Sequence, residues 1–119
     1  MVLIYPTTSF VKAAKKLMKK YSSFGNDLKE FEKSLIKNPF IGTDLGGGLR
    51  KIRLSIKSKN KGKRGGARVI TFIASTSEDI VHLLFVYDKS ERDNIEDKEL
   101  TELLESNGLN TSNKKASNL

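Results

Sequence analysis

The pattern of apolar positions predicts two helices near the start of the chain. The apolar face of the first helix is formed by Phe10, Ala13, Ala14, Leu17 and Tyr21. Thr8 or Ser9 can cap this helix. Leu28, Phe31 and Leu35 form the apolar face of the second helix, and Asp27 with Glu30 has the spacing of a capping box at its start. We therefore expect two antiparallel helices joined by a short turn.

Four further segments have the apolar patterns of strands, at residues 2–5, 49–56, 67–74 and 80–87. In the second of these, Ile52 and Leu54 fall on one face, and Lys51 and Arg53 fall on the other. The fourth is apolar almost throughout, which is typical of a central strand covered on both faces. We expect a loop over residues 41–48 and a last helix that ends near Gly108.

This order of elements predicts an α+β fold, because helices and strands are largely segregated along the chain. We expect two N-terminal helices packed on a small twisted antiparallel sheet, with a short C-terminal helix. Residues 1–108 are expected to form a single domain. Residues 109–119 are polar and aperiodic, and we expect a disordered tail there.

The charge of the chain indicates what kind of partner it binds. The net charge is +8, and the basic residues are concentrated in the middle of the chain. Residues 50–68 hold nine of the 22 lysines and arginines and no acidic residue. A buried strand face would hold Lys51 and Arg53 rigidly, and a basic glycine-containing loop follows them. Such a surface is suited to a polyphosphate backbone.

The residue types present exclude several kinds of catalytic site. The chain has no cysteine and one histidine, His82, so a disulfide framework and a two-histidine ribonuclease mechanism are excluded. His82 lies in an apolar strand and is interpreted as a structural residue. The glycine run at 46–48 lacks the Lys-Ser/Thr pair of a phosphate-binding P-loop. We expect no metal and no cofactor. We also expect a soluble cytoplasmic protein, because the apolar run at residues 2–5 is too short for a signal peptide and no apolar segment is long enough to span a bilayer.

Three residues on predicted strands are the first candidates for chemistry: Lys51, Arg53 and Arg68. If the second and third strands pair as a hairpin, Arg68 comes near the face that carries Lys51 and Arg53. Tyr87 and Lys89, at the end of the last strand, complete the candidate catalytic set. The candidate RNA- or ribosome-binding residues are Arg50, Lys57, Lys59, Lys61, Lys63 and Arg64.

Three stretches, LGGGLRKIRL, SKNKGKRGGARVITF and LLFVYDKSERDNIEDKEL, resemble the RelE/HigB superfamily of bacterial toxins, and in particular its HigB-like branch. The resemblance implies a ribosome-dependent endoribonuclease that cleaves translated mRNA in the ribosomal A site. It implies metal-independent attack by a ribose 2′-OH on the adjacent phosphate, with cationic side chains stabilising the negative charge. It also implies a cognate antitoxin, which in this branch often carries a helix-turn-helix domain.

Residue by residue, the resemblance assigns the strand lysines of the family to Lys51 and Arg53, and its following arginine to Arg68. The family pattern is not followed at Ser90, which stands in place of an arginine, or at Glu96, which stands in place of a late tyrosine. Two other functions stay open: a ParE-like inhibitor of DNA gyrase on the same scaffold, and a non-catalytic RNA- or ribosome-binding module.

Overall fold

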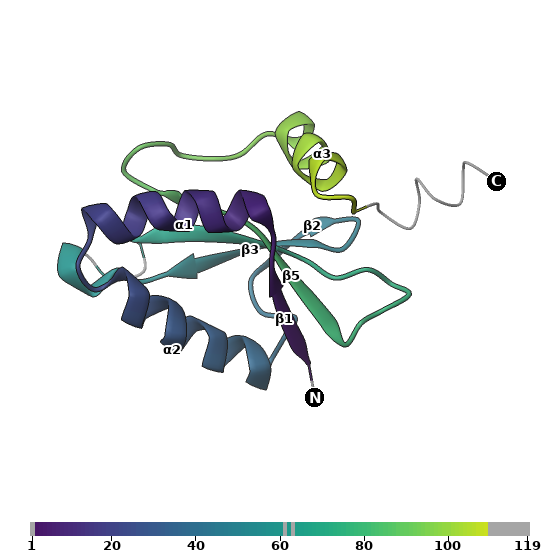
Figure 1. The fold of residues 1–119 in the computed structure, drawn as a ribbon, viewed down its shortest axis with the longest axis horizontal. Coiled ribbons are helices and arrows are strands. Elements are labelled where there is room, and N and C mark those ends of the chain that lie inside the picture. Colours follow the sequence, from purple (N-terminus) through teal and green to yellow (C-terminus); the bar gives the residue numbers. More distant parts are fainter. Residues whose placement is uncertain (1, 61, 63, 110–119) are drawn as a thin grey trace.

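The computed structural model describes residues 2–60, 62 and 64–109, and has the expected α+β class (Figure 1). Its elements, in chain order, are β1 (Leu3–Pro6), α1 (Thr8–Lys20), α2 (Phe24–Lys37), β2 (Thr43–Gly46), β3 (Leu49–Leu54), the 3-10 turn η1 (Lys57–Lys59), β4 (Ala67–Phe72), β5 (Ile80–Asp88) and α3 (Asp97–Ser106). The four predicted strands and three predicted helices are thus confirmed, with shifted ends.

The strands form one sheet in the order β1-β5-β4-β3-β2. The pairs β2–β3, β3–β4 and β4–β5 are antiparallel, but β1 runs parallel to β5 at the edge, so the sheet is mixed. This departs from the fully antiparallel sheet we expected. A parallel pair needs a long connection between its strands, and here almost the whole domain lies between β1 and β5.

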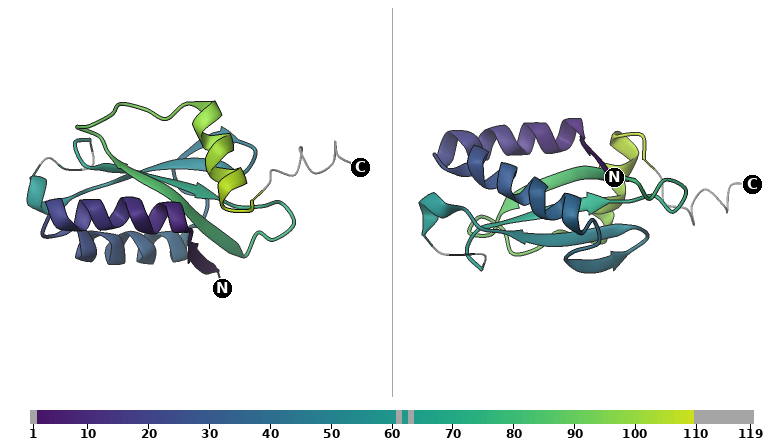
Figure 2. Two further views of the ribbon diagram at one scale, coloured as in Figure 1. Left: turned by 45° about the horizontal axis from the view of Figure 1, so that its top comes forward. Right: turned by 90° about the horizontal axis from the view of Figure 1, so that it is seen from below.

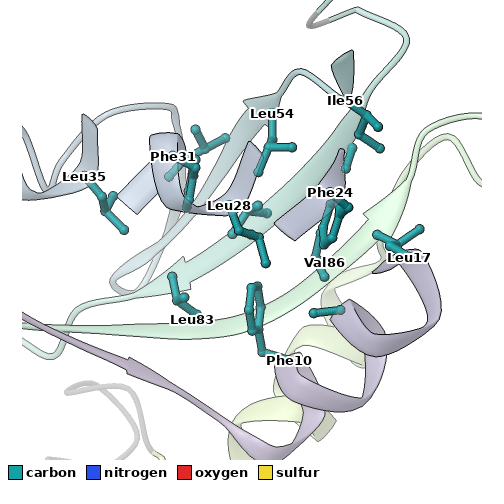
Figure 3. Packing of buried hydrophobic residues seen from close by; sticks show 14 of the residues in the cluster. Phe10, Leu17, Phe24, Leu28, Phe31, Leu35, Leu54, Ile56, Leu83 and Val86 are labelled. Atoms are coloured by element: carbon teal, nitrogen blue, oxygen red, sulfur yellow. The ribbon is translucent and has the colours of Figure 1, made fainter. Parts of the chain in front are cut away.

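Helices α1 and α2 lie side by side on one face of the sheet (Figure 2). Thr7 caps α1: its Oγ1 accepts a hydrogen bond from the Phe10 amide at 3.1 Å and donates one to the Leu83 carbonyl at 2.9 Å. The cap lies one residue before the predicted one, because the same hydroxyl also ties the helix to β5. The core beneath the helices is apolar (Figure 3), with Phe24 and Leu35 fully buried against side chains of β3 and β5.

Helix α2 begins at Phe24 rather than at the predicted capping box. Asp27 lies inside the helix, where its buried carboxylate accepts hydrogen bonds from the Ser23 hydroxyl at 2.7 Å and the Lys57 amide at 3.2 Å. The prediction that Asp27 and Glu30 form a capping box is therefore wrong. Burial of Phe24 favours the helical first turn despite Gly25, and Asp27 binds the basic loop instead of capping the helix.

The predicted loop at 41–48 contains a further strand, β2, which pairs with β3. Gly46, Gly47 and Gly48 all have positive φ angles, of 89°, 60° and 90°. These angles favour glycine, so the glycine run is explained by the turn between the two strands.

The opposite face of the sheet is covered by α3 over part of its area. Leu100 and Leu104 of α3 pack in a second apolar cluster with Leu49, Ile70 and Tyr87. Leu109, which we assigned to the tail, packs against this cluster, and its amide donates to the Leu104 carbonyl at 2.8 Å. The remaining tail residues lie outside the described part of the chain. No helix within residues 2–60, 62 and 64–109 is long and apolar enough to cross a membrane.

Candidate functional site

Three candidate residues lie in one row across three neighbouring strands. Arg53 of β3 is the register partner of Arg68 of β4, and Arg68 is the register partner of Tyr87 of β5. Residues directly opposite one another in antiparallel strands project from the same face. Arg53, Arg68 and Tyr87 therefore project together on the face opposite α1 and α2, and we call them the cross-strand row.

Lys51 adds a third cation to the same face. It lies two residues before Arg53 in β3, so both side chains project from one side of the strand. The Lys51 ammonium donates a hydrogen bond of 3.2 Å to Oδ1 of Asn94, in the segment between β5 and α3. The strand alternation read from the sequence therefore places Lys51 and Arg53 correctly, and the hairpin brings Arg68 beside them.

Arg68 is held at the centre of the row by its own loop. Its Nη1 donates to the Ala67 carbonyl and its Nη2 to the Arg64 carbonyl, each at 3.1 Å. The side chain is only 6% exposed. Burial, and then the like charge of Arg53, lower the pKa of Arg68. A guanidinium keeps its proton at neutral pH even so. A bound anion would offset both the burial of this charge and its repulsion by Arg53.

Tyr87 supplies a buried hydroxyl at the end of the row. Among the described residues, its Oη is one of two buried side-chain oxygens without a hydrogen-bond partner. Burial raises the pKa of Tyr87, although Arg68 and Arg92 act in the opposite direction. The phenol is therefore protonated at neutral pH, and its proton is available for donation to a ligand.

Arg92 was missed by the sequence analysis, although it extends this cationic surface. Its guanidinium carbon lies 5.2 Å from the centre of the Tyr87 ring. Glu99 of α3 accepts two of its hydrogen bonds, at 2.6 and 3.2 Å, and these bonds raise the pKa of Arg92. The sequence offered no periodic signal here, because Arg92 lies in an irregular segment and its partner lies seven residues later in a helix.

The other candidates lie outside the row. The Lys89 ammonium is 2.8 Å from Oδ1 of Asp93. Arg50 lies 3.9 Å from Asp44 and 5.7 Å from the centre of the Phe40 ring, near β2. Lys57 and Arg64 are exposed, and their role in RNA or ribosome binding stays a prediction. Lys61 and Lys63 lie outside the described residues.

Lys59 has an environment unlike that of a solvated loop lysine. Its side chain is 6% exposed, and its ammonium lies 2.8 Å from Oδ1 of the buried Asp88. This contact was not foreseen, because the two residues are far apart in sequence. His82 packs between the rings of Tyr5 and Phe72, and burial lowers its pKa, which agrees with a structural interpretation.

A crevice of about 420 Å³ adjoins the row between α1, β5 and α3. Its apolar lining includes Ala13, Leu17, Phe85 and Leu103, and cations line it at Lys12, Lys16 and Arg92. Tyr87 also lines this crevice. A molecule bound there would therefore contact one end of the cross-strand row.

No three His, Cys, Asp or Glu side chains are grouped as metal ligands within the described part of the chain. The local chemistry is instead that of an anion site: three cations on two strands, a fourth in the segment after β5, and a protonated phenol. Arginine and tyrosine donors in this arrangement suit a phosphate group and the charge that develops on it.

The sequence model of the family described as "RelE toxin of RelE / RelB toxin-antitoxin system" matches residues 2–118. This span includes every element of the fold and every residue of the cross-strand row. The match supports the RelE/HigB superfamily, while assignment to the HigB-like branch stays a prediction. The chain therefore belongs to the RelE family of toxins of toxin–antitoxin systems.

Proposed function

We propose that this toxin is an endoribonuclease that cleaves translated mRNA in the ribosomal A site. The observation that supports the proposal most strongly is the cross-strand row, in which two arginines lie beside a buried, protonated hydroxyl that has no partner among the described residues. Family membership supports the same activity, since RelE-type toxins are generally ribonucleases.

In the proposed reaction, the ribose 2′-OH releases its proton to solvent and its oxygen attacks the adjacent phosphorus, while the bond from phosphorus to the 5′-oxygen breaks. Arg53 and Arg68 bind the non-bridging oxygens, where negative charge increases in the transition state. Tyr87 donates its proton to the departing 5′-oxygen, and the resulting phenolate is stabilised by Arg68 and Arg92. Lys51 contributes positive charge from the same strand as Arg53. The reaction leaves a 2′,3′-cyclic phosphate and a 5′-OH.

Purified translating ribosomes provide the direct test. An mRNA with a single 2′-deoxynucleotide at the scissile position should be resistant to cleavage, whereas the all-ribose mRNA should be cut. Cleavage of the deoxy substrate would refute attack by the 2′-OH. Ribosome binding without any new mRNA end would instead identify a non-catalytic module, and intact mRNA with DNA breaks in cells would identify a gyrase inhibitor.

The antitoxin is proposed to cover this surface with an acidic segment, and a helix-turn-helix domain is expected elsewhere in it. The +8 charge of the toxin favours such a partner. The crevice beside Tyr87 adds an apolar floor for one or more hydrophobic side chains, with lysines at its edge. A complex that is insensitive to salt and leaves Arg53 and Arg68 accessible would contradict this proposal.

A further inference from the structure

The basic loop after β3 is bound at each of the three residues of η1, Lys57, Ser58 and Lys59. The Lys57 amide donates to Oδ2 of Asp27 at 3.2 Å, and the Ser58 amide donates to Oγ of Ser23 at 2.9 Å. The third contact is the 2.8 Å ion pair between Lys59 and Asp88. These contacts place η1 against the turn between α1 and α2, as Figure 2 shows.

Asp88 is the centre of a buried polar network. Its side chain is fully buried and accepts hydrogen bonds from the Tyr21 hydroxyl at 2.5 Å and from the Ser90 amide and hydroxyl at 2.9 and 2.7 Å. Lys20 lies 3.5 Å away on the exposed side. The Lys59 ammonium also lies 5.3 Å from the centre of the Tyr21 ring. Lys59 thus lies between a buried carboxylate and an aromatic ring.

A buried ion pair is weak support for stability, because desolvation offsets most of the attraction between the two charges. Such a pair does fix geometry, since each charge is costly to leave without the other. Lys59 is therefore held in one position, although a lysine of a glycine-containing loop would ordinarily be mobile and solvated.

The location of this ion pair connects it to the cross-strand row. Asp88 directly follows Tyr87 in β5 and is the register partner of Ala67, which directly precedes Arg68. The far end of the loop is bound to the row as well, because Arg68 donates to the Arg64 carbonyl and the Lys89 amide donates to the Gly66 carbonyl at 3.0 Å. Gly66 fits closely there: a Cβ atom would lie 2.0 Å from the Leu54 carbonyl oxygen.

We propose that the Lys59–Asp88 ion pair positions the basic loop, and through the loop the guanidinium of Arg68, for binding a phosphate group. Lys59 and Asp88 are thereby positioning residues that do not touch the substrate. This inference rests on the proposed function for its catalytic consequence, but its structural part can be tested without any cleavage assay.

The first measurement is amide hydrogen exchange in Lys59→Met, which removes the charge and keeps most of the side-chain length. The amides of residues 57–60 all donate hydrogen bonds in the wild type, so they should be protected. We expect their exchange to accelerate about tenfold or more in the variant, because local opening of the loop becomes easier. Lys33→Met is the matched control, since it breaks an exposed ion pair of 3.6 Å with Glu30 and should leave exchange at 57–60 unchanged.

Inorganic phosphate binding, followed through the NMR signal of the Arg68 side chain, is the second measurement. Lys59→Met should weaken phosphate binding severalfold more than Lys33→Met does, although both variants lose one positive charge. Equal weakening in the two variants, or unchanged exchange at residues 57–60, would overturn the proposal. Neither result depends on whether the protein cleaves RNA.

Cleavage on translating ribosomes is the third measurement, and here the double variant Lys59→Met/Asp88→Asn separates positioning from stability. Removing both charges leaves no unpaired buried ion, so the double variant should melt close to the wild-type temperature. Its kcat should nevertheless fall by about tenfold to a hundredfold with a small change in KM, as expected for a misplaced catalytic group. Recovery of wild-type kcat together with the melting temperature would show that the ion pair serves stability alone.

Discussion

Replacing Tyr87 with phenylalanine should slow catalysis without destabilising the fold. The substitution removes one oxygen atom from a residue that is 4% exposed, and that oxygen has no hydrogen-bond partner among the described residues. A buried polar group without a partner costs about 1–3 kcal/mol of desolvation, so its removal should not destabilise the fold. We expect the free energy of unfolding to rise by about 1 kcal/mol.

The same substitution should greatly lower the rate of mRNA cleavage. If Tyr87 protonates the departing 5′-oxygen, its loss should lower kcat by about 10²- to 10⁴-fold, the usual contribution of a general acid. Urea unfolding of the free protein and single-turnover cleavage on translating ribosomes measure the two effects separately. Tyr5→Phe is the matched control, because it removes the same atom from a side chain on the exposed edge strand, and it should change neither quantity.

Two results would refute this reasoning. A loss of 1 kcal/mol or more in Tyr87→Phe would mean that the hydroxyl makes a stabilising hydrogen bond in the free protein. Unchanged kcat would mean that Tyr87 is not the proton donor, whatever its position in the row.

Three further predictions follow from the same contacts. Arg53→Gln should reduce cleavage by about 10²-fold with less than 0.5 kcal/mol change in unfolding free energy, because Arg53 is exposed; equal losses of both would contradict its role. Burial raises the pKa of Asp88, but hydrogen bonds from Lys59, Tyr21 and Ser90 outweigh it and hold that pKa well below its ordinary value. The stability from Asp88 is therefore present above its unfolded pKa, near 4, and lost as pH falls further, so acid unfolding curves of Asp88→Asn should be flatter below pH ~4 than those of the wild type. Phe24→Ala should cost about 3–5 kcal/mol in urea unfolding, since its ring is fully buried, and a cost below 1 kcal/mol would contradict the packing in Figure 3.

The cross-strand row was largely predictable, because its members lie on strands. A period of two residues fixes the faces of Lys51 and Arg53, and an antiparallel hairpin then brings Arg68 beside them. The buried state of Tyr87 was not predictable in the same way, because it depends on packing with α3, which joins the sheet from farther along the chain.

Contacts between distant segments explain what the sequence analysis missed. In the sequence, nothing distinguishes Lys59 from the other lysines of its loop. In the structure, it donates a hydrogen bond to Asp88, which lies 29 residues later in the chain. Asp27 has the spacing of a helix cap, yet its carboxylate binds the Lys57 amide across 30 residues. The short strand β2 has a sequence of low strand propensity, TDLG, and forms through its pairing with β3 beyond a glycine turn.

Mapping mRNA 5′ ends in bacteria after induction of the toxin is the most direct test of the central claim that the cross-strand row cleaves translated mRNA. Each reporter transcript should be compared with a copy that lacks its start codon, and the wild-type toxin with Arg53→Gln. We predict new 5′-OH ends within the reading frame only in the translated copy, and far fewer of them with the variant. Equal cleavage of both copies, or an undiminished pattern with Arg53→Gln, would contradict the account.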